Sequence, residues 1–160
     1  MTVRESLTHL GLEPAGALKS PGGRAYPFVW VRRRGPRACI SGHLPLNPDG
    51  TLAQPLGKVG VDLSSEQGAQ AARKAALAML GSLERELGDL DRIAAWVRVF
   101  GMVNAAPGFT ALAPVINGFS ELILELYGPE RGAHARSAVG MAELPFGVPV
   151  EIEAEVEVAS

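Results

Sequence analysis

The stretch ARSAVGMAELPFGVPVEIE, residues 135–153, decides the fold of this chain. It carries a lone arginine, Arg136, near its start and ends in an alternation of apolar and acidic residues. A period of two residues is typical of a β-strand with one face in the core and the other in solvent. Pro145 and Gly147 divide the stretch, and such residues mark turns. The local pattern therefore predicts two strands joined by a Pro/Gly turn.

The alternation continues to Val158 and assigns two faces to the last strand. One face is apolar, and the other carries Glu151, Glu153, Glu155 and Glu157. Carboxylates on one face repel each other, so most of them are expected in solvent. Glu151 is nearest to the corner where the strand enters the sheet, and partial desolvation there raises a carboxylate pKa toward that of a general base. Glu151 is therefore the candidate base.

Arg136 is the natural partner for a carboxylate, because its planar guanidinium presents two parallel N–H groups. The pattern alone favours two interpretations of Arg136 equally. One is a ligand-binding arginine, and the other is a structural salt bridge to one of the glutamates.

Hydrophobic periodicity and turn residues predict the other elements. In the longest helix, Ser64 and Gln67 form a capping box and Gly88 marks the end. Pro114 is placed in the first turn of the last helix, which stops at residues 127–129. Helices are expected where apolar residues recur every three or four positions, at residues 2–11, 64–87 and 113–127. Strands are expected where β-branched and aromatic residues gather, at residues 28–31, 38–42 and 90–103.

Residues 32–37 (Arg-Arg-Arg-Gly-Pro-Arg) separate the first two strands and predict a hairpin with a basic turn. Exposed charge is the normal state of a turn, so a solvated loop is the simpler interpretation. An anion or RNA contact is the functional one, and the lack of interleaved aromatic residues gives RNA little support. Cys39, in the second strand, is expected to be a buried structural thiol.

Length and composition predict one domain over residues 1–160, with an N-terminal helix and loop at residues 1–23 and a core at residues 24–160. The net charge of −2 argues against a broad nucleic-acid-binding surface. A single cysteine excludes an internal disulfide and favours the cytoplasm, and no apolar run is long enough for a membrane span. The histidines and the cysteine do not have the spacing of metal ligands, so no metal is expected, and no glycine-rich phosphate-binding loop predicts a cofactor.

The expected order of elements is hairpin, helix, strand, helix, strand, strand. This order indicates an α+β domain with both long helices on one face of the sheet. Apolar residues such as Val29, Val97 and Ile152 are too many for one covered face. Oligomerisation through the other face is therefore expected.

Two groups of residues resemble the RidA/YjgF/YER057c/UK114 family over most of the chain. The C-terminal group is His134-Ala-Arg136-Ser-Ala-Val139, Glu143-Leu-Pro145 and residues 150–154, and the early group is Ser41-Gly-His-Leu-Pro45. The N-terminal helix, Gly57-Lys-Val-Gly60, residues 103–109 and residues 115–118 resemble the longer subgroup labelled endoribonuclease L-PSP/chorismate mutase-like.

The resemblance implies the Bacillus chorismate mutase-like fold, a mixed β-sheet with two long helices on one face, assembled as a homotrimer with clefts between subunits. It also implies that the last two strands need not form a simple hairpin. The activity implied is hydrolytic deamination of reactive enamines and imines of the 2-aminoacrylate type to 2-keto acids and ammonia. The partner would be a small carboxylate substrate, a 2-imino or 2-keto acid, with no nucleic acid and no membrane.

Carried over by position, Arg136 matches the arginine that holds the substrate carboxylate and Glu151 the glutamate that activates water. Ser41 and Asn117 match polar residues near the pocket. The chain departs from the family at the two remaining substrate-binding positions, Phe28 and Ala138, where RidA proteins usually have tyrosine and many have cysteine. Loss of the tyrosine hydroxyl removes a hydrogen-bonding group. The alternatives are a non-catalytic trimer that binds small carboxylates and, with less support, a ribonuclease.

Overall fold

The computed structural model describes residues 1–160 and contains one five-stranded mixed sheet. The strands are β1 (Val31–Arg34), β2 (Arg37–His43), β3 (Ile93–Asn104), β4 (Ala135–Met141) and β5 (Val150–Val158). Their order across the sheet is β1-β2-β5-β3-β4. Strands β3 and β4 pair in parallel, and all other pairs are antiparallel. The expected α+β fold with a mixed sheet is confirmed.

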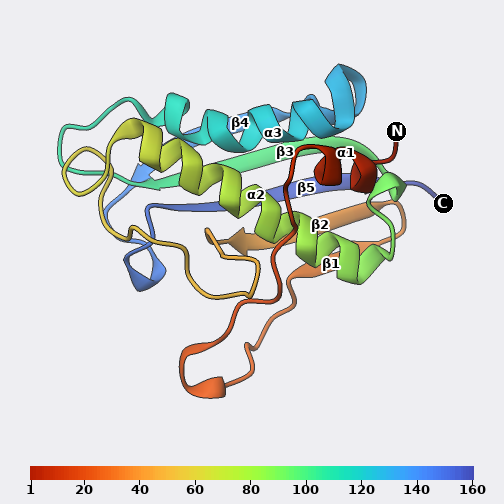
Figure 1. The fold of residues 1–160 in the computed structure, drawn as a ribbon, viewed down its shortest axis with the longest axis horizontal. Coiled ribbons are helices and arrows are strands. Elements are labelled where there is room, and N and C mark those ends of the chain that lie inside the picture. Colours follow the sequence, from red (N-terminus) through yellow and green to blue (C-terminus); the bar gives the residue numbers. More distant parts are fainter.

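The helices are α1 (Val3–His9), α2 (Ser65–Leu87) and α3 (Leu112–Gly132). Figure 1 shows α2 and α3 side by side across one face of the sheet, with both chain ends on the same side of the molecule. Short 3₁₀ turns lie at Pro21–Gly23, Leu90–Arg92 and Pro145–Gly147. No helix combines the length and the apolar character that a membrane crossing requires.

Local signals determine where the long helices begin and end. Ser64 and Gln67 form the expected capping box at the start of α2, and Gly88 ends the helix in a left-handed conformation. Pro114 lies in the first turn of α3, as expected. Regular helix in α3 stops at Gly128, whose φ of 71° breaks the helical path before one further turn. These boundaries agree closely with the sequence pattern.

The main core lies between the helices and the covered face of the sheet. It contains Met79, Trp96, Phe119 and Ile152, which are all nearly inaccessible to water. A Cβ atom at Gly118 of α3 would overlap the backbone carbonyl of Ala69 in α2. Glycine is therefore what lets the two helices approach this closely.

The last two strands do not form the hairpin that their sequence alone suggests. Strand β4 lies at the edge of the sheet beside β3, and β5 lies between β2 and β3. Strand β3 therefore separates the two strands that are consecutive in the chain. The resemblance to the RidA family already implied this departure.

The first hairpin forms, but its strand is displaced from the expected position. Strand β1 begins at Val31 instead of residue 28, and it includes Arg32 to Arg34. The turn is therefore only Gly35 and Pro36, and all four arginines lie on strands, three on β1 and Arg37 at the start of β2. Backbone and side-chain hydrogen bonds from Ser41 to the carbonyls of Trp30 and Val29 hold the preceding segment without making it a strand.

Two expectations, on Cys39 and on the apolar residues that need a second cover, are wrong in part. Cys39 is exposed, because its neighbours Ala38 and Ile40 point into the core and Cys39 points the other way. Ile152 lies under the helices and needs no second cover, whereas Val97 is 47% exposed. The uncovered face also carries Phe100, with the guanidinium of Arg98 5.7 Å from its ring centre.

Candidate functional site

Arg136 lies on β4, the outer strand of the sheet, and faces helix α3. Its partner in the β3–β4 register is Val99, which is buried under the helices. Arg136 Nη1 donates to Asn117 Oδ1 at 2.9 Å and to Ser120 Oγ at 3.1 Å. Both acceptors belong to α3. Two residues of one helix therefore fix the orientation of the guanidinium.

His134 completes a short hydrogen-bond chain behind Arg136. Its Nδ1 lies 2.7 Å from the carbonyl oxygen of Gly132, which can only accept a hydrogen bond. Nδ1 therefore carries the proton, and Nε2 accepts from Ser120 Oγ at 2.9 Å. Burial is the main factor that lowers the pKa of His134 and keeps the ring neutral, and the nearby charge of Arg136 adds to the effect. Ser120 can therefore donate to His134 and still accept from Arg136.

No carboxylate lies within ion-pair distance of Arg136. The salt bridge to a glutamate does not form within one chain. The Asn117 and Ser120 bonds both use Nη1, so Nε and Nη2 have no hydrogen-bond partner. These two nitrogens form the side of the fork that matches a carboxylate. The half-buried Arg136 is thus a fixed cation with free donors.

Glu151 lies on β5 and faces the other side of the sheet. It pairs with Met102, whereas the adjacent Ile152 points into the main core. No donor in the chain reaches the Glu151 carboxylate in the hydrogen-bond network. Burial, and after it the charge of Glu153, raises the pKa of Glu151 above the ordinary value for glutamate. A half-buried carboxylate with a raised pKa is suited to accept a proton.

Gly42 gives the Glu151 side chain its space. A Cβ atom at position 42 would overlap the Glu151 carboxylate. The β2–β5 register shifts between Ile40 and His43, which places this glycine against the glutamate. The Ser-Gly part of the early motif is therefore in direct contact with the C-terminal motif.

Ser41 and Phe28, two of the predicted substrate-binding residues, are engaged in contacts within the chain. Ser41 uses its hydroxyl to donate to the Val29 carbonyl at 2.7 Å. Phe28 is 48% exposed, and its ring centre lies 5.2 Å from that of Tyr26 and 5.0 Å from that of Trp30. The Tyr26 hydroxyl is buried without a hydrogen-bond partner. Tyr26 therefore packs beside Phe28 and presents no hydroxyl at its position.

Ala138 lies on the same face of β4 as Arg136 and packs against the main core. The sequence-predicted residues thus form two groups. Arg136, Asn117 and Ala138 belong to the β4–α3 side, and Glu151, Ser41 and Phe28 belong to the side of β2 and the first hairpin. Arg136 and Glu151 are on opposite faces of one sheet, so one copy of the chain cannot direct both at the same ligand.

The sequence reasoning missed the polar residues that support the site. His134 belongs to the C-terminal motif, but the motif does not predict its bond to Ser120, and no sequence pattern used above points to Ser120. A signal was present, because Asn117 and Ser120 are three residues apart on a helix, which places them on one face. His134 and Arg136 are two residues apart in the chain. No group of three histidine, cysteine or acidic side chains gathers as a metal site requires.

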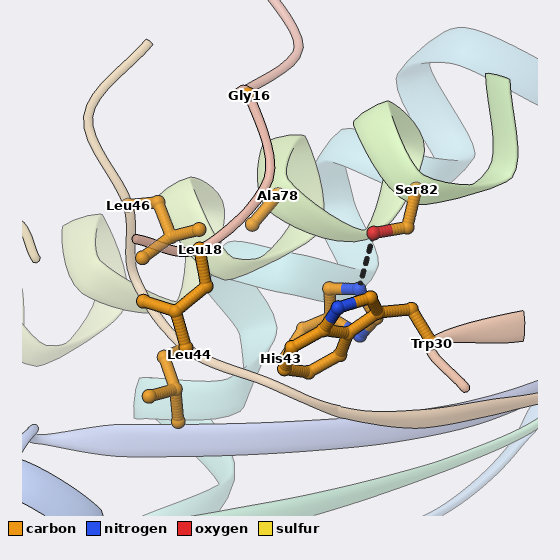
Figure 2. A pocket seen from close by; sticks show the side chains of 8 residues that line it. All are labelled: Gly16, Leu18, Trp30, His43, Leu44, Leu46, Ala78 and Ser82. Atoms are coloured by element: carbon orange, nitrogen blue, oxygen red, sulfur yellow. Dashed lines mark hydrogen bonds between the residues drawn. The ribbon is translucent and has the colours of Figure 1, made fainter. Parts of the chain in front are cut away.

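A second histidine is buried beneath α2, beside a small cavity. His43 Nδ1 lies 2.6 Å from the Ser41 carbonyl, and Nε2 lies 2.8 Å from Ser82 Oγ. Burial lowers the pKa of His43 to about 4. Figure 2 shows the cavity, whose free volume is about 10 Å³, close to the space of one water molecule. His43 is therefore a neutral, hydrogen-bonded side chain of the interior.

Known proteins are similar to this chain in sequence and in fold. Residues 22–158 match the family model described as Endoribonuclease L-PSP. Protein TCP17 of Trypanosoma cruzi is 40% identical over 155 residues, which cover 97% of this chain and 93% of that protein. The chain belongs to the endoribonuclease L-PSP family, also called RidA/YjgF.

Solved structures of L-PSP family members have the same fold. A putative endoribonuclease from Shewanella oneidensis is 26% identical, with a TM-score of 0.86 over 99% of this chain and all of that one. RidA from an Antarctic Psychrobacter is 19% identical, with a TM-score of 0.55 over 89% of this chain and 94% of that one. At this identity the RidA structure bears on the fold alone. The L-PSP family is consistent with small-molecule processing or an endoribonuclease-like role.

Proposed function

We propose that this protein hydrolyses reactive 2-imino acids and their enamine tautomers, of the 2-aminoacrylate type, to 2-keto acids and ammonia. The observation that carries the proposal is the state of Arg136. It is a fixed cation on the sheet edge, it has no counter-ion, and Nε and Nη2 are free. Membership of the L-PSP family supports the same reaction class.

Arg136 binds the substrate carboxylate in this proposal. Asn117 and Ser120 hold Nη1, so the guanidinium is oriented before the ligand arrives. Preorganisation of this kind lowers the entropy lost on binding. Lysine at this position would keep the charge but lose the two-pronged geometry.

Glu151 acts as the base in the hydrolytic step. It takes a proton from water, the water oxygen bonds to the imine carbon, and the π electrons of the C=N bond move to nitrogen, which takes up the proton. In the resulting carbinolamine the hydroxyl proton moves through Glu151 to nitrogen, the C–N bond breaks, and ammonia leaves a 2-keto acid. The raised pKa of Glu151 makes it a stronger base than an ordinary glutamate, which favours its taking the proton from water.

The active site in this proposal lies between two copies of the chain. Because Arg136 and Glu151 face opposite sides of the sheet, the ligand meets Arg136 of one copy and Glu151 of another. We propose a homotrimer as the assembly, which would cover the apolar residues that remain exposed on the helix-free face, including Val97.

The test is to generate 2-aminoacrylate by enzymatic dehydration of serine and to follow pyruvate release. The wild type should accelerate release beyond the uncatalysed rate, and Arg136→Ala should not. Arg73→Ala is the matched control, because Arg73 is an exposed arginine whose partner, Glu125, is also exposed. If the wild type gives only the uncatalysed rate, the deaminase proposal fails.

A second candidate function is binding of small carboxylates without turnover. The two departures favour it, because Phe28 and Ala138 supply no polar atom where RidA proteins usually have tyrosine or cysteine. Calorimetry with 2-keto acids in place of the unstable imines separates the candidates. Saturable binding that Arg136→Ala abolishes, together with no acceleration of pyruvate release, supports the binding function. No heat of binding at millimolar concentration counts against it.

The endoribonuclease description of the family supplies one more outcome to test. Cleavage of RNA by highly purified wild-type protein, lost in Arg37→Ala, would favour that activity over deamination. We expect intact RNA, because Arg37 is held at 2.6 Å by Glu155 and the chain carries a net charge of −2.

A further inference from the structure

A groove lies at the opposite edge of the sheet from Arg136. It runs between β1 and the C-terminal part of α2 and has a volume of about 450 Å³. Since β1 and β4 are the two edge strands, this groove is distinct from the Arg136 site. It is lined by residues 28–33, which lead into and form most of β1, and by Ser82, Arg85 and Glu86 of α2.

Three cations and one anion line the groove. Arg32, Arg33 and Arg85 face a single carboxylate, that of Glu86, and none of the three arginines forms an ion pair. Arg33 Nε donates to the Gly35 carbonyl at 3.0 Å, so Arg33 keeps both terminal nitrogens for a ligand. The groove therefore has an unbalanced positive charge at short range.

Arg85 is the best-positioned of these cations. Arg85 is an exposed residue, but its guanidinium is partly buried, with Nη1 donating to the Ala15 carbonyl at 3.0 Å and Nη2 to Ser82 Oγ at 3.1 Å. Both contacts are neutral acceptors, so they orient the guanidinium without cancelling its charge. Desolvation is the main cause of a lowered pKa for Arg85, and the charge of Glu84 only partly opposes it.

A hydrogen bond to the buried His43 fixes the orientation of the Ser82 hydroxyl. Since the Ser41 carbonyl fixes the proton of His43 on Nδ1, Ser82 donates its only hydroxyl hydrogen to Nε2. Figure 2 shows this bond, with the Trp30 ring beside that of His43 at 5.2 Å. Ser82 is therefore only an acceptor toward the groove, and what it accepts is Arg85. The buried histidine positions the arginine indirectly.

The other wall of the groove is apolar. Phe28 is 48% exposed and Val29 is 54% exposed, although both are large hydrophobic residues. The rings of Phe28 and Trp30 meet edge to face, with centres 5.0 Å apart. An aromatic pair of an exposed Phe28 and a half-buried Trp30, beside unpaired arginines, is suited to a ligand with an apolar ring and an anionic group.

We propose that this groove binds a small aromatic anion, with a phosphate or carboxylate group on Arg85 and Arg33 and a flat ring against Phe28 and Trp30. The groove shares no cation with the deaminase proposal, although Phe28 also stands at a position where the resemblance implies substrate binding. It gives a function to the basic hairpin that the Arg136 site leaves unused.

Tryptophan fluorescence tests this site, because the chain has only two tryptophans. Trp30 lines the groove, and Trp96 is buried in the core. The probe is phenyl phosphate, with inorganic phosphate and phenol as the two halves of the ligand. We expect saturable quenching by phenyl phosphate in the wild type and in Trp96→Phe, and weaker binding of each half.

Variants locate the binding site of the probe. Arg85→Met should weaken phenyl phosphate binding about tenfold, the size expected for one charge-assisted hydrogen-bonded contact. Arg33→Gln should also weaken phenyl phosphate binding, and it replaces Arg85→Met as the test if that variant does not fold. Arg73→Met, which removes an exposed arginine from the same helix, should bind as the wild type does, and so should Arg136→Met.

Three results would overturn the proposal. They are no quenching at ten-millimolar probe, unchanged affinity in both Arg85→Met and Arg33→Gln, and loss of binding in Arg136→Met. The last result would place the probe at the β4 edge. The outcome of the pyruvate assay affects none of these readings, so the two proposals can fail separately.

Discussion

Arg136 and Glu151 belong to strands on either side of β3, and their side chains leave the sheet on opposite faces. The register shows this directly, because Arg136 pairs with the buried Val99 and Glu151 pairs with Met102, three residues further along the same strand. Neighbouring residues on a strand alternate between faces, so an odd separation changes the face. Any ligand that uses both groups must therefore contact two copies of the chain.

Subunit mixing tests this geometry. Arg136→Ala and Glu151→Gln should each be inactive alone, because each removes one half of every site. After dissociation and joint reassembly, roughly a quarter of the sites in a randomly mixed ring should hold both wild-type groups. Pyruvate release by the mixture is the measurement. Activity that stays at the level of the separate variants would show that the two residues do not share a site.

Neutralising Glu151 should stabilise the protein at neutral pH. The folded chain raises the pKa of Glu151, so above that pKa the ionised carboxylate is less favourable in the folded than in the unfolded state. Glu151→Gln removes this cost, and its melting temperature should exceed that of the wild type at pH 7. The difference should vanish below the ordinary glutamate pKa, where both states are protonated. A lower melting temperature at pH 7 would contradict the assigned desolvation.

His43 should make the fold sensitive to acid. Its folded pKa of about 4 lies below the ordinary value of 6.5, so stability is present above pH 6.5 and is lost as the pH falls toward 4. The full loss across this window is about 3 kcal/mol. Denaturant unfolding at several pH values should show the slope in the wild type and in His9→Gln, which changes an exposed histidine. His43→Gln should show a flatter profile.

A side chain at position 42 should displace Glu151 and leave the fold intact. The Cβ of Gly42→Ala would meet the far end of the flexible Glu151 side chain rather than backbone, so the carboxylate moves and the strands stay paired. We expect pyruvate release to fall at least tenfold with a melting temperature within a few degrees of the wild type. Undiminished activity would mean that the position of Glu151 is unimportant.

The α2–α3 contact should be intolerant of a methyl group at position 118. In Gly118→Ala the new Cβ meets the backbone of Ala69, which cannot rotate away. Separating two packed helices should cost about 1–3 kcal/mol. Chemical denaturation measures this loss, with Glu121→Ala, an exposed change on the same helix, as the control. A stabilised Gly118→Ala would show that the helices are less closely packed.

Helix boundaries and strand faces were predictable because they depend on neighbours in the chain. The capping box of Ser64 and Gln67 and the break at Gly128 act over a few residues. The acidic and apolar faces of β5 follow from its period of two. Cys39 was assigned wrongly for a related reason: an apolar run of residues does not say which of them face the core, and the contacts of Ala38 and Ile40 decide it.

The supporting residues of the site depend on contacts between distant segments. Arg136 was identified by its motif, but its anchor on Ser120 and the chain to His134 form only when β4 packs against α3. The same holds for the arrangement of His43, Ser82 and Arg85, in which a strand and a helix meet.

By itself, the sequence determined the elements, the α+β class and the residue types of the candidate site, because periodicity, caps and turn residues act locally. Only the tertiary structure decided that β3 lies between β4 and β5, since a parallel neighbour of β3 comes from a long-range crossover through α3. That strand order, together with the register, sets the faces of Arg136 and Glu151. The residues at the ends of one motif consequently face opposite sides of the sheet.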